Sequence, residues 1–243
     1  MLKLNNISKK FEGLIALDNF SYELEKGRII ALVGPNGSGK TTLFNIITGF
    51  VKKDKGSVYF EDKNISELEA HHIAKLGISR TFQQVNYFQN LTLFDHLLLC
   101  FNDTDSIFFN LFYKKGNKDK IKKIKKIMVL VGLQKPLNTK VSELSYGQKK
   151  LVGLAMALLR EHNLIFLDEP VAGVNPILKN KIKNILLGLK KKGETVFIVE
   201  HDINFVKEVA DEVVVLDRGR IMAFGSPNLV FNNENVIKAY VGN

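Results

Sequence analysis

The stretch Gly34-Pro35-Asn36-Gly37-Ser38-Gly39-Lys40-Thr41-Thr42 decides the fold of this chain. It has the G-x-x-x-x-G-K-[ST] pattern of a phosphate-binding loop. Glycines allow successive backbone N–H groups to turn inward around a phosphate, because no Cβ atom obstructs them. The sequence therefore predicts that these nine residues surround the phosphates of a nucleotide.

Both flanks of this loop support the prediction. The apolar run Ile29–Val33 is typical of a buried parallel strand. Apolar residues after the loop recur at helical spacing, at Leu43, Ile46, Ile47 and Phe50. Such a helix points its positive end at the phosphate, where Lys40 reaches the β- and γ-phosphates and the Thr41 hydroxyl binds Mg²⁺. We expect the phosphates of a nucleotide and Mg²⁺ as ligands; the alternative, a plain glycine-rich turn, is disfavoured by the flanks.

Composition restricts the class of protein. The chain has 243 residues, of which 45% are hydrophobic, so it can form one large α/β domain or a core with a small insert. The single cysteine, Cys100, excludes a disulfide framework within the chain, and its apolar surroundings predict a buried structural thiol. Residues 1–6 lack the apolar segment of a secretory signal, and no run reaches membrane-spanning length. We expect a soluble, cytoplasmic chain.

The net charge of +10 is partly concentrated in one segment. Eight of the thirteen residues from Lys114 to Lys126 are lysine. The favoured interpretation is a solvated helix face. Contact with anionic lipid head groups is second. Nucleic acid is third, because no recognised nucleic-acid module accompanies the charge.

The order of patterns along the chain predicts an interrupted α/β core. Strand-like segments over residues 2–7, 20–24 and 56–60 predict a small antiparallel sheet, followed by a helix over 66–77 and an extended segment over 78–84. We divide the chain into a nucleotide-binding core with its antiparallel β subdomain, and a helical insert with a loop of its own. The core comprises residues 1–85 and 160–243, the insert residues 86–159 and the loop residues 102–118.

The α/β alternation returns after the insert. Strands are predicted over residues 164–167, 195–199 and 213–216, with a helix over 203–210. A further helix follows Asn175 as N-cap and Pro176 as first residue. Its apolar face comprises Leu178, Ile182, Ile185, Leu186 and Leu189.

An acidic pair ends the strand over residues 164–167. A carboxylate at the end of a buried strand is costly unless a cation pairs with it, and ligands of open α/β sheets bind at strand ends. Asp168 is therefore predicted to hold Mg²⁺, and Glu169 to polarise a water molecule for attack on the γ-phosphate. The alternative is a strand that simply ends in an acidic turn.

A second phosphate site is predicted at a helix end. Ser145 and Gln148 have the S-x-x-Q form of a capping box. Apolar residues follow at helical spacing, at Leu151, Leu154, Ala155, Leu158 and Leu159. The N-terminus of this helix exposes a hydroxyl and a positive dipole end, which favour an anion. An ordinary helix cap is the alternative.

Five spaced motifs together resemble the ATP-binding subunit of an ABC transporter over essentially the whole chain. They are Gly34–Thr42, Gln83, Leu144–Gln148, Leu164–Glu169 and His201. The resemblance implies an α/β fold with a P-loop NTPase (RecA-like) core, and ATP hydrolysis coupled to transport.

The resemblance also implies a role for single residues. Glu169 is similar to the catalytic base, and His201 to the switch histidine on the γ-phosphate, for which a core or capping histidine is the alternative. Gln83 is similar to the glutamine that senses Mg²⁺ and the γ-phosphate beside the membrane subunit, and Phe11 to the aromatic ring on adenine. The residues that would contact ATP held by the opposite subunit are Ser145, Gly147 and Gln148.

Local features resemble the ATPases of branched-chain amino-acid importers, in particular the longer of two such subunits. They are Arg80–Gln83, Leu144–Gln148, Ala172–Pro176, Val236–Gly242 and the long insert. Two residues depart from the wider family: Tyr146 replaces a glycine, as it often does in this subfamily, and Asn175 replaces an aspartate. The second departure lies in the loop that crosses the dimer in the wider family.

The resemblance implies several partners. They are a second ATPase subunit, identical or different, that meets this one head to tail, separate membrane permeases and, indirectly, an extracytoplasmic binding protein. The chain is expected at the cytoplasmic face of the inner membrane. Rival cargoes are urea, amides and lipopolysaccharide. A soluble ABC ATPase acting on nucleic acid or ribosomes is less favoured, because the chain lacks a second ATPase half and a long coiled-coil or DNA-reading insert.

Overall fold

The computed structural model describes residues 1–81, 87–101 and 117–241, and in them a six-stranded sheet of order β10-β9-β3-β8-β7-β6 forms the centre. Its strands are β3 (Ile29–Val33), β6 (Ile78–Arg80), β7 (Leu164–Asp168), β8 (Thr195–Val199), β9 (Glu212–Asp217) and β10 (Arg220–Gly225). All neighbouring pairs are parallel except β9 with β10. The predicted α/β class is confirmed.

A second sheet of order β2-β1-β4-β5 is antiparallel, as predicted. Its strands are β1 (Leu2–Phe11), β2 (Leu14–Leu24), β4 (Lys55–Phe60) and β5 (Lys63–Asn64). β1 and β2 are longer than the alternating segments of the sequence. The register shifts between Leu4 and Ile7, where Asn6 has φ 52°, and such a bulge breaks the alternation without ending the strand.

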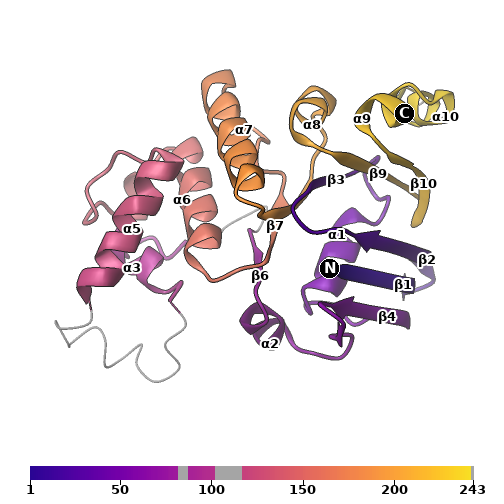
Figure 1. Cartoon of the computed structure of the whole chain (residues 1–243), viewed down its shortest axis with the longest axis horizontal. Coiled ribbons are helices and arrows are strands. Elements are labelled where there is room, and N and C mark those ends of the chain that lie inside the picture. The colour runs from indigo at the N-terminus through magenta and orange to yellow at the C-terminus, as the bar shows by residue number, and fades with distance from the viewer. Residues whose placement is uncertain (82–86, 102–116, 242–243) are drawn as a thin grey trace.

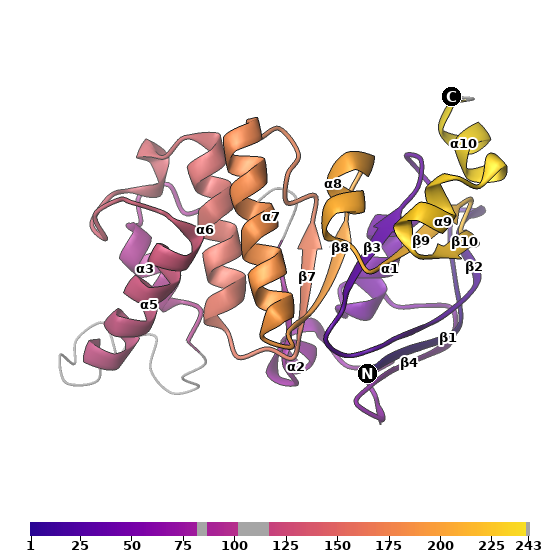
Figure 2. The same ribbon diagram turned by 45° about the horizontal axis from the view of Figure 1, so that its top comes forward.

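Helices lie on both faces of the central sheet. They are α1 (Lys40–Ile47), α2 (Ala70–Lys75), α3 (Leu93–Leu98), α5 (Asn117–Val131), α6 (Tyr146–Leu159), α7 (Pro176–Lys191), α8 (Ile203–Val209), α9 (Pro227–Phe231) and α10 (Glu234–Val241), with a 3₁₀ turn at Val141–Glu143. Figure 1 shows α3, α5 and α6 at one end of the molecule and the antiparallel sheet at the other. In Figure 2, α6, α7 and α8 run side by side along the parallel strands.

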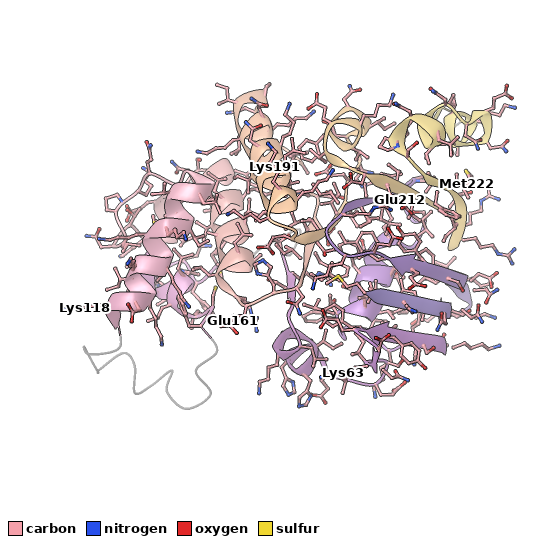
Figure 3. All side chains as sticks on the ribbon, viewed as in Figure 1. Lys63, Lys118, Glu161, Lys191, Glu212 and Met222 are labelled. Carbon is pink, nitrogen blue, oxygen red and sulfur yellow. The ribbon has the colours of Figure 1, made fainter. Side chains whose placement is uncertain are left out.

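The parallel strands β3, β7, β8 and β9 have continuous apolar interiors because both of their faces are buried. Ile30 and Phe166 belong to a core shared with α1 and the antiparallel sheet. Ala31 and Ile165 belong to a second core shared with α6, α7 and α8. Figure 3 shows side chains filling the space between these layers. Burial on both sides explains why these runs show no polar alternation.

Two helix predictions were too long. Phe50 was expected on the apolar face of α1, but α1 ends at Ile47 and Phe50 is exposed. Gly49, with φ 76°, takes the left-handed conformation that commonly ends a helix. The helix predicted over 66–77 is reduced to α2. The hydroxyl of Ser66 accepts a hydrogen bond from the Val58 backbone at 2.8 Å, which ties this segment to β4 before the helix begins.

The structure tests the predicted extended segment 78–84 and the predicted loop 102–118 only in part. Of the extended segment 78–84, β6 accounts for 78–80 and residues 82–84 lie outside the described residues. The predicted loop 102–118 lies mostly outside them too, and α5 begins at Asn117. Among the described residues, no helix is long and apolar enough to cross a membrane.

The α5 helix and Cys100 agree with their favoured interpretations. Ile124 and Met128 of α5 are buried against the helical core, whereas Lys122 and Lys125 are exposed, as on a solvated helix face. Lys114 and Lys115 of the predicted lysine segment lie outside the described residues. Cys100 is buried, and burial raises the pKa of its thiol to about 12. A thiol protonated at neutral pH is a poor nucleophile, as expected for a structural cysteine.

Three buried aromatic rings, of Phe44, Phe166 and Phe197, join α1 to the sheet with centroids 4.8 to 5.4 Å apart. Phe197→Ala should lower the free energy of unfolding by about 3–5 kcal/mol, because it removes a buried ring and leaves a cavity. Phe224→Ala is the matched control; its ring is 61% exposed, so a loss within about 0.5 kcal/mol is expected. Urea denaturation measures both, and equal losses would contradict this account of the core.

Candidate functional site

The phosphate loop connects β3 to α1 and is confined by the antiparallel sheet. A Cβ atom on Gly39, which has φ 108°, would lie 2.3 Å from the backbone oxygen of Ala16. Only glycine fits there, so the sequence pattern is a steric requirement of the loop. The hydroxyl of Ser38 is buried and has no hydrogen-bond partner within the described part of the chain. A buried hydroxyl without a partner is available to donate a hydrogen bond to an oxygen atom of a ligand.

Lys40 lies across the inside of the loop. Its buried ammonium group donates hydrogen bonds to the backbone oxygens of Gly34 at 2.8 Å and Pro35 at 2.9 Å. Burial lowers the pKa of Lys40, and the carboxylates of Glu169 and Asp168 act in the opposite direction. The loop lysine and the acidic pair therefore share one electrostatic environment. An ammonium held by neutral carbonyl oxygens can exchange them for charged phosphate oxygens.

Asp168 is the last residue of β7, and its carboxylate is buried. Burial raises its pKa, whereas the neighbouring guanidinium of Arg80 lowers it. The Arg80 Nη2 atom lies 3.3 Å from Asp168 Oδ2. The backbone N–H of Asp168 donates to the hydroxyl of Thr81 at 3.1 Å. The acidic end of β7 is thus fixed by the neighbouring edge strand β6 and the residue after it.

Glu169 turns sharply out of β7. Its φ of 48° is unusual for a residue with a side chain, and such conformations concentrate at functional sites. Its backbone N–H donates to Val199 of β8 at 2.9 Å. The Nε2 atom of His201 lies 3.0 Å from Glu169 Oε1. His201 is exposed, and α8 is capped by Asp202, so neither the core nor the capping interpretation of His201 holds.

Glu200 is a buried carboxylate that the sequence analysis missed. It accepts hydrogen bonds from the backbone of Val171 at 2.9 Å and of His201 at 3.1 Å. Burial raises its pKa and these hydrogen bonds lower it. It joins the segment after Glu169 to the end of β8. Its signal was available, because Glu200 follows a buried apolar strand just as Asp168 ends one.

The α6 helix begins with the predicted capping box. The backbone of Gln148 donates to the Ser145 hydroxyl at 3.3 Å, and the backbone of Ser145 to the Gln148 side chain at 3.0 Å. Lys150 of the same helix donates to the backbone oxygen of Glu169 at 2.8 Å. The start of α6 is therefore tied to the end of β7. Figure 1 nevertheless places α6 and α1 on different sides of β7, so one chain keeps the two predicted phosphate sites apart.

The remaining predicted residues have different positions. Phe11 ends β1, and its ring is exposed with the Lys9 ammonium 5.2 Å from its centroid. Thr41 lies in the first turn of α1. Asn175 caps α7, as predicted, by accepting a hydrogen bond from the backbone of Leu178 at 2.8 Å. Gln83 lies outside the described residues.

This set of side chains can bind a nucleotide and a hard cation. Carboxylate and hydroxyl oxygens are the protein ligands that Mg²⁺ prefers, and Asp168 with Thr41 offers both. The unsatisfied hydroxyl of Ser38 and the ammonium of Lys40 suit phosphate oxygens. The contact between His201 and Glu169 places an imidazole ring beside a carboxylate that acts on Lys40.

Comparison with known proteins agrees with this chemistry. The family described as ABC transporter matches residues 17–172. The probable branched-chain amino acid transport ATP-binding protein LivG of Methanocaldococcus jannaschii is 39% identical over 250 residues, covering 100% of this chain and 97% of that protein.

Solved structures are similar over the same length. A nucleotide-free ATP-binding cassette from an ABC transporter has a TM-score of 0.88 and 38% identity, covering 100% of this chain and 99% of its own. A dimeric cassette in a post-hydrolysis state, bound to ADP and Pi, has a TM-score of 0.80 and 27% identity, covering 93% of this chain and 99% of its own. With its phosphate loop, acidic strand end and capped helix in place, this chain belongs to the ABC transporter family of ATP-binding cassettes.

Proposed function

We propose that this chain binds and hydrolyses ATP between two cassette subunits that meet head to tail. The observation that carries the proposal is the arrangement at one sheet edge, where Glu169 contacts His201 at 3.0 Å and shares the electrostatic environment of Lys40. The phosphate loop of one subunit would hold the triphosphate. The helix start at Ser145 and Gly147 of the partner subunit would cover it.

Each residue then has a defined task. Lys40 and the loop N–H groups bind the phosphates, and the exposed ring of Phe11 stacks on adenine. Thr41, Asp168 and Gln83 would hold Mg²⁺, which when bound neutralises charge on the phosphates. Glu169 accepts the proton of the attacking water molecule. His201 contacts the γ-phosphate while its ring stays against Glu169.

The second subunit supplies the missing half of the site. One solved cassette of the same fold is dimeric in a post-hydrolysis state with ADP and Pi, which supports this assembly. Ser145 holds the N-terminus of α6, where the helix dipole favours an anion. Gln148 supports this end through the capping box. Closure of two subunits would exclude water, and hydrolysis would let them separate.

Transport through separate membrane subunits is the proposed role of this hydrolysis. The helical block 86–159, together with Gln83 just before it in the core, would pass the motion to permeases at the cytoplasmic face of the membrane. Relatives named as branched-chain amino acid transport proteins favour branched-chain or other hydrophobic amino acids as cargo, delivered by an extracytoplasmic binding protein. Urea, amides and lipopolysaccharide are the rival cargoes.

Lys40→Ala should weaken nucleotide binding by at least about tenfold, equivalent to about 1.4 kcal/mol, because the buried cation at the phosphates is lost. Isothermal titration with ATP measures the affinity. Lys63→Ala is the matched control, since Lys63 is an exposed residue of β5. Unchanged affinity in Lys40→Ala would count against the phosphate loop as the binding site.

Glu169→Gln should keep ATP affinity within about twofold but lower hydrolysis by about 10²–10⁴-fold, because the amide cannot accept the proton. With ATP the variant should elute as a closed dimer. Phosphate release and size-exclusion chromatography measure the two effects. Glu161→Gln, at an exposed residue beyond α6, serves as control. Hydrolysis by Glu169→Gln at the wild-type rate would remove Glu169 from the role of base.

The cargo is tested in proteoliposomes that contain this subunit, its co-purifying permeases and a binding protein. Leucine, isoleucine or valine should stimulate ATP hydrolysis and accumulate inside, and a Glu169→Gln complex should do neither. Stimulation by urea or an amide alone would replace the proposed cargo. Salt-sensitive DNA or RNA binding, without any permease, would instead support the soluble class of ATPase.

A further inference from the structure

The guanidinium group of Arg80 is buried and bonds to two elements of the site, α1 and β7. Its Nη1 atom donates to Asn45 Oδ1 and to Thr48 Oγ1, each at 2.8 Å, at the C-terminal end of α1. Its Nη2 atom lies 3.3 Å from Oδ2 of Asp168, at the end of β7. The side chains of Arg80 and Asp168 are only 7% and 5% exposed. One side chain from the edge strand β6 therefore bridges α1 and β7.

Neighbouring groups fix the orientation of this bridge. The Cζ atom of Arg80 lies 5.8 Å from the ring centroid of Phe44 and 5.7 Å from that of Phe50. The hydroxyl of Thr48, which accepts from Arg80, donates in turn to the backbone oxygen of Phe44 at 2.6 Å. A planar guanidinium that meets two rings and has fixed acceptors has little freedom to rotate.

The bridge connects the two elements that would supply metal ligands. Thr41 lies in the first turn of α1 and Asp168 ends β7, so their separation depends on how α1 is held against the sheet. Mg²⁺ demands near-ideal octahedral geometry with ligand distances of about 2.1 Å, and it tolerates little change in that separation. A contact to one oxygen of Asp168 sets the rotation of the carboxylate and leaves the other oxygen for a ligand.

We propose that Arg80 is a positioning residue for the metal site: it sets the orientation of the Asp168 carboxylate and ties it to the helix that carries Thr41. The inference rests on the proposed function, because it takes Asp168 as a metal-holding residue. Lysine can replace Arg80 only in part, since a single ammonium lacks the planar fork that reaches α1 and β7 together.

The test measures how Mg²⁺ strengthens nucleotide binding, independently of hydrolysis. A fluorescent ADP analogue is titrated with Mg²⁺, and separately in EDTA. In Arg80→Met the Mg²⁺ concentration for half-maximal enhancement should rise at least tenfold, while affinity in EDTA stays within twofold of the wild type. Mn²⁺ binding to the ADP complex, followed by electron paramagnetic resonance, should weaken in parallel. Arg80→Lys should recover less than half of the loss.

Two further variants separate positioning from a general loss of structure. Thr48→Val removes an acceptor of Arg80 without touching Asp168, and it should raise the Mg²⁺ requirement two- to threefold. This variant carries the test if Arg80→Met fails to fold. Arg160→Met removes a second arginine that lines the same surface pocket as Arg80, and it should leave the Mg²⁺ requirement unchanged.

Asp168→Asn distinguishes failure of this inference from failure of the proposed function. If Asp168→Asn raises the Mg²⁺ requirement but folded Arg80→Met and Thr48→Val leave it within twofold of the wild type, Arg80 has no positioning role. If Asp168→Asn leaves the requirement unchanged as well, the proposed metal site is wrong and this inference is overturned with it. An equal rise in Arg160→Met would also overturn it, because any loss of charge there would suffice.

Discussion

Buried opposite charges at one edge of the parallel sheet are the constraint on which this structure depends. Lys40 and Asp168 both lie where burial favours the neutral form, which lowers the pKa of the first and raises that of the second. Carboxylates counteract the effect at Lys40, and Arg80 counteracts it at Asp168. Charges held in this way cost stability unless they are paired. The fold retains them where a triphosphate and a cation would complete the pairing.

The sheet topology brings these charges together. β3 pairs with β8 and β8 with β7, all parallel, so the residues after each strand gather at the same edge. The phosphate loop, Glu169 and His201 meet there although they are far apart in the sequence. The start of α6 is attached to this edge through Lys150 but stays apart from α1 (Figure 1). Because the start of α6 cannot cover the phosphate loop of its own chain, we propose that a second subunit covers it.

The sequence was least informative about where helices and strands begin and end, because one hydrogen bond or one backbone angle decides those points. The helical spacing of Phe50 suggested a longer α1, but a left-handed glycine ends the helix first. Ser66 was predicted to begin a helix, but its hydroxyl accepts a hydrogen bond from the backbone of β4. The bulge near Asn6 hides the full length of β1. In each case a single hydrogen bond or backbone angle, absent from any periodic pattern, overrides the period.

The sequence by itself determined the phosphate loop, the acidic strand end and the capping box of Ser145 with Gln148. Their physics operates within a few consecutive residues, through glycine sterics, strand burial and helix capping. Only the tertiary structure decided which distant groups meet. His201 and Glu169 are 32 residues apart, and Arg80 and Asp168 are 88 residues apart. Such contacts depend on strand order and on how α1 packs against the sheet, and neither leaves a periodic signal along the chain.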